Sequence, residues 1–257
     1  MTTPATSELD ALLDAFVHAC LDVFGEQRVV AVVLHGSAAK GGFIPGFSDV
    51  DFIVLLAPEC FDEFGLQLDD AFAIQERIAA IPWERASAAY PQAYFYDARN
   101  MPAWWTGPIA SASRVLHGAF PDDLRPTPDR MRAAALRLLR DDLPGLIHSD
   151  TESFSDSADS ALPRRLRLLS TRVTPSMFSL LVLRSGDPLG EWTRTKHEAA
   201  HRLAAAYPGV APAALPRQFY RNVPELLGGQ IDVGLARRTY RIGLEFLIWA
   251  HRNSLEA

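Results

Sequence analysis

The feature that most constrains the fold of this chain is the segment from Val29 to Leu56, VVAVVLHGSAAKGGFIPGFSDVDFIVLL. Its two apolar runs, roughly residues 28–35 and 49–56, have the length of buried strands and enclose a glycine-containing loop. Residues i and i+2 of a strand point to the same face, so Asp49 and Asp51 should share a face where the second strand begins. The pattern predicts two neighbouring strands with a pair of carboxylates at one end.

The polar residues of this segment indicate phosphate and metal chemistry. Two carboxylates on one face repel each other unless a cation lies between them, and hard oxygen ligands suit Mg²⁺, which proteins usually hold with one or two carboxylates plus substrate phosphates. Gly36 and Ser37 offer an open backbone whose N–H groups can meet a phosphate, and Lys40 adds a positive charge nearby. We therefore expect nucleotide binding here, with Mg²⁺ at Asp49 and Asp51.

The stretch HGSAAKGGFIPGFSDVDFIVLL resembles the core motif of the nucleotidyltransferase superfamily, in which a hydrophobic strand, Gly-Ser, a short turn and Asp-x-Asp follow one another. Within that superfamily it is similar to the aminoglycoside adenylyltransferases that modify streptomycin and spectinomycin. The resemblance implies a Mg²⁺-dependent enzyme of antibiotic resistance that moves AMP from its co-substrate ATP to a hydroxyl of a small polar acceptor. An aminoglycoside is the acceptor that the family favours.

The third acidic residue of the family motif has no clear counterpart. In the family a glutamate on a later strand acts as general base on the acceptor hydroxyl, and the matching position in the expected strand 90–97 is Gln92, which cannot accept a proton at neutral pH. Asp97 lies at an odd spacing from Gln92, so only a bulge would turn it to the same face. Three alternatives stay open: another carboxylate is the base, the metal alone activates the substrate, or the chain is a nucleotide-binding protein that has lost catalysis.

Periodicity along the chain predicts an α/β fold in which a small mixed-sheet nucleotidyltransferase domain, residues 1–120, precedes an all-α helical domain, residues 121–257. The polar, serine-rich segment 149–160 is expected to be an exposed loop. The helical segments predicted by apolar spacing and by Pro or Gly boundaries are 7–24, 59–80, 129–142, 162–185, 193–206 and 232–252.

The C-terminal half carries two competing motifs at one place. A long helix, a short loop and a lysine that opens the next helix resemble the family pattern, which implies that Lys196 meets the nucleotide phosphates. Directly after it, His197, Glu198 and His201 spell H-E-x-x-H, the zinc helix of metallopeptidases. A zinc metallopeptidase is therefore an alternative function.

Charge and composition exclude some partners. The net charge of −6 over 257 residues leaves no basic surplus for general binding to nucleic acid. Two cysteines, Cys20 and Cys60, are expected to be reduced thiols of a cytoplasmic protein. The sequence shows no signal peptide and no run of about 18 apolar residues, so we expect no membrane partner.

Overall fold

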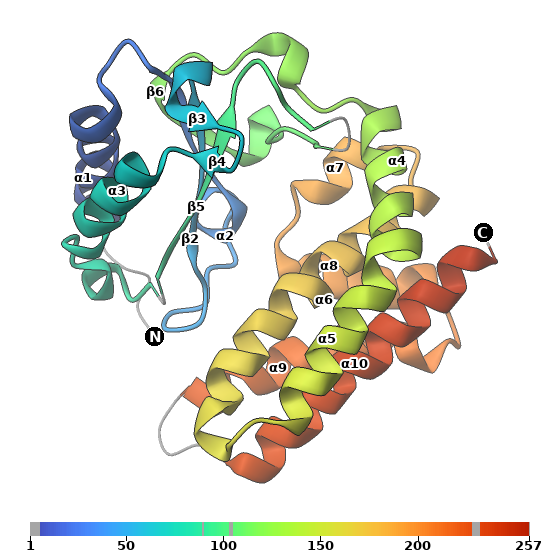
Figure 1. Ribbon diagram of the computed structural model, residues 1–257. Coiled ribbons are helices and arrows are strands. Elements are labelled where there is room, and N and C mark those ends of the chain that lie inside the picture. Colours follow the sequence, from blue (N-terminus) through green and yellow to red (C-terminus); the bar gives the residue numbers. More distant parts are fainter. Residues whose placement is uncertain (1–5, 89, 103–104, 228–231, 257) are drawn as a thin grey trace. The chain divides into compact units, whose positions relative to one another are not determined.

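The computed structural model describes residues 6–88, 90–102, 105–227 and 232–256 (Figure 1). The chain forms two compact units, Met1–Arg125 and Pro126–Ala257, and each is described here by itself. The first contains a mixed four-stranded sheet and the second is helical. The predicted fold class, a small mixed sheet followed by a helical region, is confirmed.

The sheet of the first unit has the strand order β5-β2-β1-β6. The central strands β1 (Val29–His35) and β2 (Val50–Leu56) are the two apolar runs, and they pair antiparallel. Strand β5 (Pro91–Asp97) pairs parallel with β2, and β6 (Arg114–Gly118) pairs antiparallel with β1. Because β2 is flanked on both sides, the end at which it begins is held in a fixed register.

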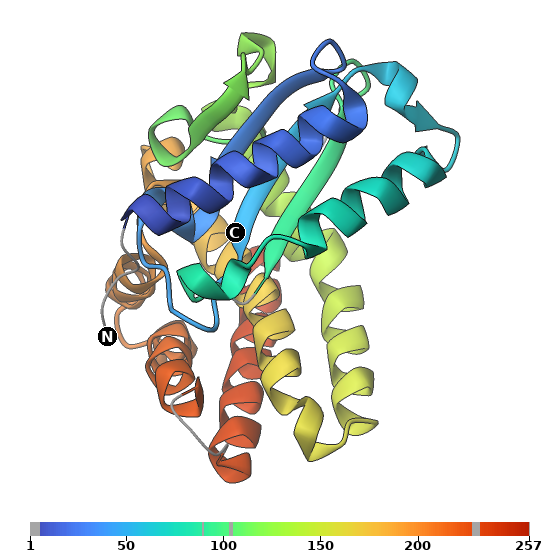
Figure 2. The ribbon, with the colours of Figure 1, turned by 90° about the vertical axis from the view of Figure 1, so that its left-hand side faces the viewer.

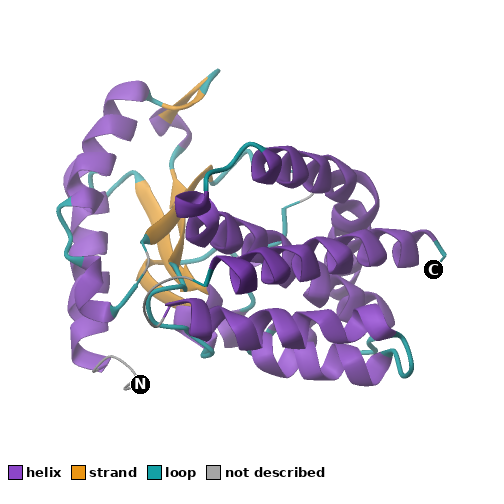
Figure 3. Cartoon of the chain, turned by 90° about the horizontal axis from the view of Figure 1, so that it is seen from below, coloured by secondary structure: helices purple, strands orange, loops and turns teal. Residues whose placement is uncertain are grey.

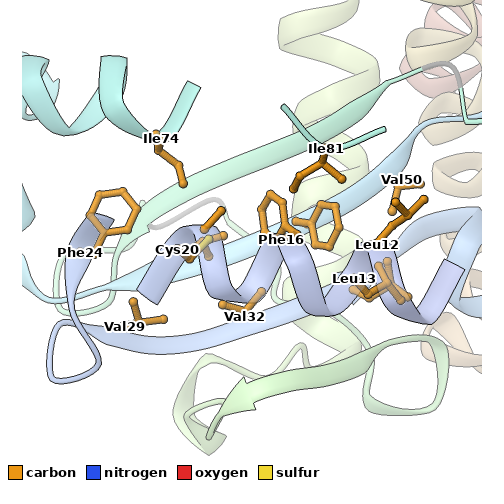
Figure 4. Packing of buried hydrophobic residues seen from close by; sticks show 14 of the residues in the cluster. Leu12, Leu13, Phe16, Cys20, Phe24, Val29, Val32, Val50, Ile74 and Ile81 are labelled. Carbon is orange, nitrogen blue, oxygen red and sulfur yellow. The ribbon is translucent and has the colours of Figure 1, made fainter. Parts of the chain in front are cut away.

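One face of the sheet packs on α1 (Thr6–Phe24) and α3 (Leu68–Ala79), as Figure 2 shows. The buried positions of α1 recur every three or four residues, and Figure 4 shows Phe16 and Cys20 projecting from that helix into the cluster. The ring of Phe16 stacks on that of Phe52 in β2, with centroids 3.7 Å apart. These contacts fix β2 from the face opposite to Asp51.

The other face of the sheet is apolar only over part of its area. Ala31, Val33, Ile53 and Leu55 pack there with Trp105 and Phe120. Residues two apart along a strand share a face, so Asp51 continues the row of Ile53 and Leu55 toward the beginning of β2. The face therefore changes from a core into a polar site along a single strand.

The predicted helix over 59–80 is wrong over its first nine residues. Residues 61–66 form a small hairpin, β3 (Phe61–Asp62) and β4 (Gly65–Leu66), and α3 begins only at Leu68. Gly65 has a φ of +121°, which ordinary residues avoid, and the side chain of Asp62 accepts a hydrogen bond from the Phe64 N–H across the turn. These local turn interactions override the helical spacing of the apolar residues.

The second unit consists of packed helices (Figure 3). Asn222 on α9 donates a buried hydrogen bond to Thr239 on α10, and Gly243 lets α10 approach Leu169 of α6 closely. The helices are α4 (Pro128–Arg137), continued by a π-helical turn over Leu138–Asp142, then α5 (Leu143–Ser155), α6 (Leu162–Arg184), α7 (Pro188–Trp192), α8 (Lys196–Ala206), α9 (Leu215–Leu227) and α10 (Val233–Leu255).

The expected loop 149–160 is also wrong in part, because α5 extends to Ser155. The hydroxyls of Thr151 and Ser155 donate to the carbonyls four residues earlier, Ile147 and Thr151, so these polar side chains are accommodated within the helix. Strand β6 and helices α7 and α9 were not predicted. Within the described part of the chain, no helix is long and apolar enough to cross a membrane.

Candidate active site

Asp49 and Asp51 lie where β2 begins, with Asp51 between two neighbouring strands. Asp51 is in register with His35 of β1 on one side and with Gln92 of β5 on the other. Asp49 is 8% exposed, so its carboxylate is largely removed from water. Asp51 ends the apolar row of Ile53 and Leu55 on this face, and Asp49 directly precedes the first residue of β2.

The absence of a side chain at Gly36 leaves space for the Asp51 carboxylate. Its φ is +70°, and a Cβ added to it would lie 2.1 Å from Oδ2 of Asp51. Any other residue would therefore meet both an unfavourable backbone conformation and the carboxylate itself. The glycine next to Ser37 thus holds an acidic oxygen directly against the backbone.

The short helix α2 (Gly36–Lys40) follows β1 without an intervening loop. Ser37 is its second residue, and the Ser37 carbonyl accepts a hydrogen bond from Gly41 N–H at 3.0 Å. Lys40 is in its last turn and acts electrostatically on His35. The structure therefore brings Gly36, Ser37 and Lys40 onto one turn that begins beside Asp51.

His35 belongs to the same site and was missed by sequence reasoning. Burial, and then the positive charge of Lys40, lower the pKa of His35 to about 4, so its ring is neutral at pH 7. Its Nε2 is buried and has no hydrogen-bond partner among the described residues. The signal was available, because His35 directly precedes the Gly-Ser pair at the end of an apolar run.

The loop between α2 and β2 is folded rather than extended. Gly41, Gly42 and Gly46 all have positive φ. The hydroxyl of the buried Ser48 accepts a hydrogen bond from the Ile44 N–H at 2.9 Å. These turns return the chain from α2 to Asp49 and fix the position of the aspartate pair.

Gln92 is the neighbour of Asp51 on β5, and it is linked to an aromatic hydroxyl. Its Nε2 donates to the Tyr94 hydroxyl at 2.5 Å. Burial raises the pKa of Tyr94, and the charges of Asp51 and Asp49 raise it further. Tyr94, a second residue that sequence reasoning missed, is therefore a neutral hydroxyl within the electrostatic reach of both aspartates.

Asp97 does not join this group. The register of β2 and β5 runs regularly from Val50 opposite Pro91 to Leu56 opposite Asp97, with no bulge between them. Asp97 is therefore five residues along β5 from Gln92, a distance of about 17 Å at the usual rise of a strand. The structure contradicts the bulge that would have made Asp97 the base.

The C-terminal candidates lie in the second unit, on α8. Lys196 is the first residue of that helix, and its Nζ lies 5.9 Å from the centroid of the Tyr220 ring. Glu198 forms a capping box with Thr195, accepting from its N–H at 2.8 Å. Among the described residues, His197 and His201 belong to no group of three or more ligands able to hold a metal, and Glu198 is occupied by the helix cap. The capping role of Glu198 argues against the zinc-peptidase alternative, in which this residue would be the general base.

Comparison with known proteins agrees with this geometry. Residues 17–89, which include the C-terminal part of α1, both central strands, α2 and the aspartate pair, match the family model described as a nucleotidyltransferase domain. The chain contains a nucleotidyltransferase domain. This domain and the fold together support a transferase enzyme. No curated protein matches the chain.

One solved structure extends the similarity in fold over most of the chain. It is the crystal structure of spectinomycin adenyltransferase AAD(9) from Enterococcus faecialis with ATP and spectinomycin, with a TM-score of 0.57. The match covers 92% of this chain and 98% of that chain at 13% sequence identity, so it bears on the fold alone. In fold, the protein resembles the aminoglycoside adenylyltransferases.

Proposed function

We propose that this protein is a Mg²⁺-dependent nucleotidyltransferase that moves AMP from ATP to a hydroxyl of a small polar acceptor. The observation that carries the proposal is the contact of Asp51 with Gly36, in the register that sets Asp49 and Asp51 at the start of β2. Asp51 offers a metal ligand. Gly36, which has no side chain and directly precedes Ser37, leaves the neighbouring backbone open. An aminoglycoside is the acceptor class that we favour.

The donors fit Mg²⁺. Asp49 and Asp51 supply hard oxygen ligands, and no third His, Cys, Asp or Glu completes a metal-binding group with them among the described residues. That arrangement suits an ion that takes its remaining ligands from water and substrate phosphates. When bound, Mg²⁺ supplies positive charge that stabilises the phosphates during transfer.

The phosphate groups would be held by the first turn of α2 and by a lysine. In this proposal the N–H groups of Gly36 and Ser37 face the phosphates, and Lys40, at the end of the same short helix, neutralises them. Fixed donors and cations of this kind are the main contribution that a protein makes to phosphoryl and nucleotidyl transfer.

The acceptor would meet Gln92 and Tyr94. In the transfer, the acceptor oxygen forms a bond to the α-phosphorus, pyrophosphate leaves, and the hydroxyl proton must be released. The amide of Gln92 and the hydroxyl of Tyr94 can orient the acceptor hydroxyl by hydrogen bonds. The amide has no basic site that could take the proton of the acceptor hydroxyl. We therefore propose that Gln92 positions the acceptor and that transfer proceeds without a protein carboxylate at this position.

The presence of a glutamine at position 92 favours one rival function. Gln92, directly opposite Asp51 where the family has a base, is what a nucleotide-binding protein that has lost catalysis would show. Such a protein would bind Mg·ATP through Asp49 and Asp51 but would not release pyrophosphate with any acceptor.

Calorimetry with ATP, with and without Mg²⁺, tests the nucleotide site that both functions share. We expect Mg·ATP to bind the wild type and to bind the Asp49→Asn plus Asp51→Asn variant at least about tenfold more weakly, because two charged ligands are lost. Asp97→Asn is the matched control, since it removes a carboxylate from the far end of β5. Equal affinity in the double variant and the wild type would rule out this assignment.

A further inference from the structure

Strand β5 has one free edge. It lies at the end of the strand order β5-β2-β1-β6, so among the described strands only β2 pairs with it. The N–H of Ala98, directly after β5, donates to the Leu56 carbonyl of β2 at 2.9 Å. In a parallel pair the backbone groups of alternate residues turn to the same neighbour, so those of Pro91, Ala93 and Phe95 turn away from β2. Ala93 and Phe95 therefore offer N–H and C=O groups to a further strand.

An apolar groove with a volume of about 470 Å³ adjoins this edge, between β5 and α3. Ala93 and Phe95 line it from the strand, and Ile74 and Ile78 line it from the helix, which lies beside β5 in Figure 2. Trp83 lines the groove beyond the end of α3. No charged side chain is among the described residues that line it. The residues with outward backbone groups are thus also part of an apolar surface.

The exposed face of α3 continues this groove. One stripe of the helix surface, which has the spacing of a single face and is called the α3 stripe below, consists of Leu68, Phe72, Gln75 and Ala79. The last two of these residues also line the groove. Leu68 is 68% exposed and Phe72 is 65% exposed, and Phe64, in the hairpin before α3, is 90% exposed. A contiguous exposed surface that is mostly apolar, unlike a single exposed residue, marks an interaction site.

The α3 stripe and β5 are complementary to themselves in size. The first half of the stripe has two large apolar side chains, Leu68 and Phe72, and its second half ends in the small Ala79. A two-fold axis perpendicular to the sheet makes both elements antiparallel to those of a second copy of the chain. The large half of each stripe then faces the smaller half of the other, and Ala93 lies opposite Phe95 of the second copy.

The charges around the groove favour the same arrangement. The end at which α3 begins is acidic, because Asp62, Glu63 and Asp69 are exposed there. The end beyond α3 carries both signs, with the exposed Arg85 next to Glu84. An antiparallel pair of copies separates the two acidic ends and sets each beside an arginine of the other copy, whereas a parallel pair would place the acidic ends together. The surface therefore fits a second copy of this chain.

We propose that two copies of this chain associate through β5 and the α3 stripe, with the two β5 strands antiparallel across a two-fold axis. In this dimer the backbone groups of Ala93 bond to those of Phe95 in the second copy, and the two α3 stripes cover each other. The strand edge contributes hydrogen bonds and the stripe contributes apolar burial. The dimer forms without substrate, so the inference does not depend on the proposed transfer reaction.

Sedimentation equilibrium of the full-length chain without substrate tests the association. We expect the wild type to approach twice the mass of one chain as its concentration rises, and Phe72→Lys to associate at least about tenfold more weakly, because a charge enters the apolar stripe. The substitution makes the net charge of −6 less negative, so general charge repulsion cannot explain such a loss. Leu255→Lys is the matched control, since Leu255 is 60% exposed at the end of α10, outside the stripe and the groove. This control should associate as the wild type does.

Disulfide cross-linking tests the pairing of the strands. With Ala93 opposite Phe95, Tyr94 lies opposite Tyr94 of the second copy, at a Cα separation of about 4.5 Å that a disulfide can bridge. Tyr94→Cys should therefore form a covalent dimer under mild oxidation, whereas Val115→Cys, similarly exposed on the opposite edge strand β6, should not. The two native cysteines are buried, so they should not react.

Three results would each overturn the inference. The first is a wild type that stays monomeric at every concentration. The second is association of Phe72→Lys that equals that of the wild type. The third is failure of Tyr94→Cys to cross-link.

Discussion

At the scale of single residues, Gly36 is the position where backbone conformation and site chemistry meet. It combines a φ of +70° with the close approach of Asp51 Oδ2. Gly25, at the end of α1, has a similar φ of +78° but nothing within 4 Å of an added Cβ. Substituting each glycine therefore distinguishes the free-energy cost of the backbone conformation, present at both positions, from the cost of the contact with Asp51, present only at Gly36.

Gly36→Ala should lower the free energy of unfolding by more than Gly25→Ala, for which we expect about 1 kcal/mol from the left-handed conformation alone. It should also abolish nucleotidyl transfer, because the methyl group displaces the Asp51 carboxylate. Gly25→Ala should keep its activity. Chemical denaturation together with a transfer assay on both variants checks this, and an active Gly36→Ala enzyme would contradict the role given to the contact.

Gln92 permits a second test at this scale. Gln92→Glu places a base next to Asp51 and should raise the transfer rate, since a positioned general base contributes about 10²–10⁴-fold. Without metal the added charge should destabilise the fold by crowding three carboxylates, and Mg²⁺ should relieve much of that loss. Single-turnover rates and thermal melts with and without Mg²⁺ measure both effects.

Asp97→Asn completes this comparison. The regular register keeps Asp97 away from Asp51, so we expect the rate to remain unchanged. Loss of turnover in Asp97→Asn, with no gain in Gln92→Glu, would show that Asp97 is the general base. The role proposed for Gln92 would then be wrong.

At the scale of secondary-structure elements, α1 holds the sheet from the face opposite to the site. Phe16 is fully buried, stacks on Phe52 and contacts the ring of Trp83 edge to face. Phe16→Ala should therefore lower the free energy of unfolding by about 3–5 kcal/mol. Phe64→Ala, at a side chain that is 90% exposed, should change it by less than about 0.5 kcal/mol. Urea titrations of the two variants give both values.

In the helical unit, Glu191 links α7 to α8. Burial would raise the pKa of this carboxyl, but hydrogen bonds from Arg202, Arg194 and Ser185 outweigh burial and lower it. A carboxyl whose pKa is lower in the folded state stabilises the fold above its unfolded pKa and loses that contribution as the pH falls through the folded value. The two arginines are part-exposed, so water can solvate them when the carboxylate is removed.

We therefore expect Glu191→Gln to lower the free energy of unfolding at pH 7 by about 1–3 kcal/mol. The difference from the wild type should shrink below the ordinary carboxyl range, near pH 4 and lower. Glu245→Gln, which breaks an exposed pair with Arg241, should change stability little at any pH. A pH-independent difference for Glu191→Gln would contradict the ion-pair explanation.

The sequence predicts some elements better than others for physical reasons. β1 and β2 are evident because both of their faces are covered, which makes each an unbroken apolar run. β6 is missed because it is a short edge strand whose Arg114 and Val115 are exposed. Helix α9 is missed because Pro216 stands in its first turn, where proline is tolerated but looks like a helix breaker.

At the scale of the whole molecule, the change from sheet to helix along the chain is readable from periodicity, but the composition of the site is not. The pairing of Asp51 with Gln92 depends on the register of two strands whose paired residues are 41 positions apart in sequence. The neutral His35, the Tyr94 hydroxyl and the groove between α3 and β5 depend on packing that no local pattern records. Motif reading therefore identifies the aspartate pair, while the residues around it require the structure.

The central claim is that this protein transfers AMP, and the most direct measurement is pyrophosphate release from labelled ATP with Mg²⁺ and a panel of hydroxylated acceptors that includes aminoglycosides. We predict release that depends on an acceptor, labels that acceptor with AMP, and disappears in the Asp49→Asn plus Asp51→Asn variant. Mg·ATP binding without release for any acceptor would favour the nucleotide-binding rival. Release that persists in the double aspartate variant would contradict the account of the site.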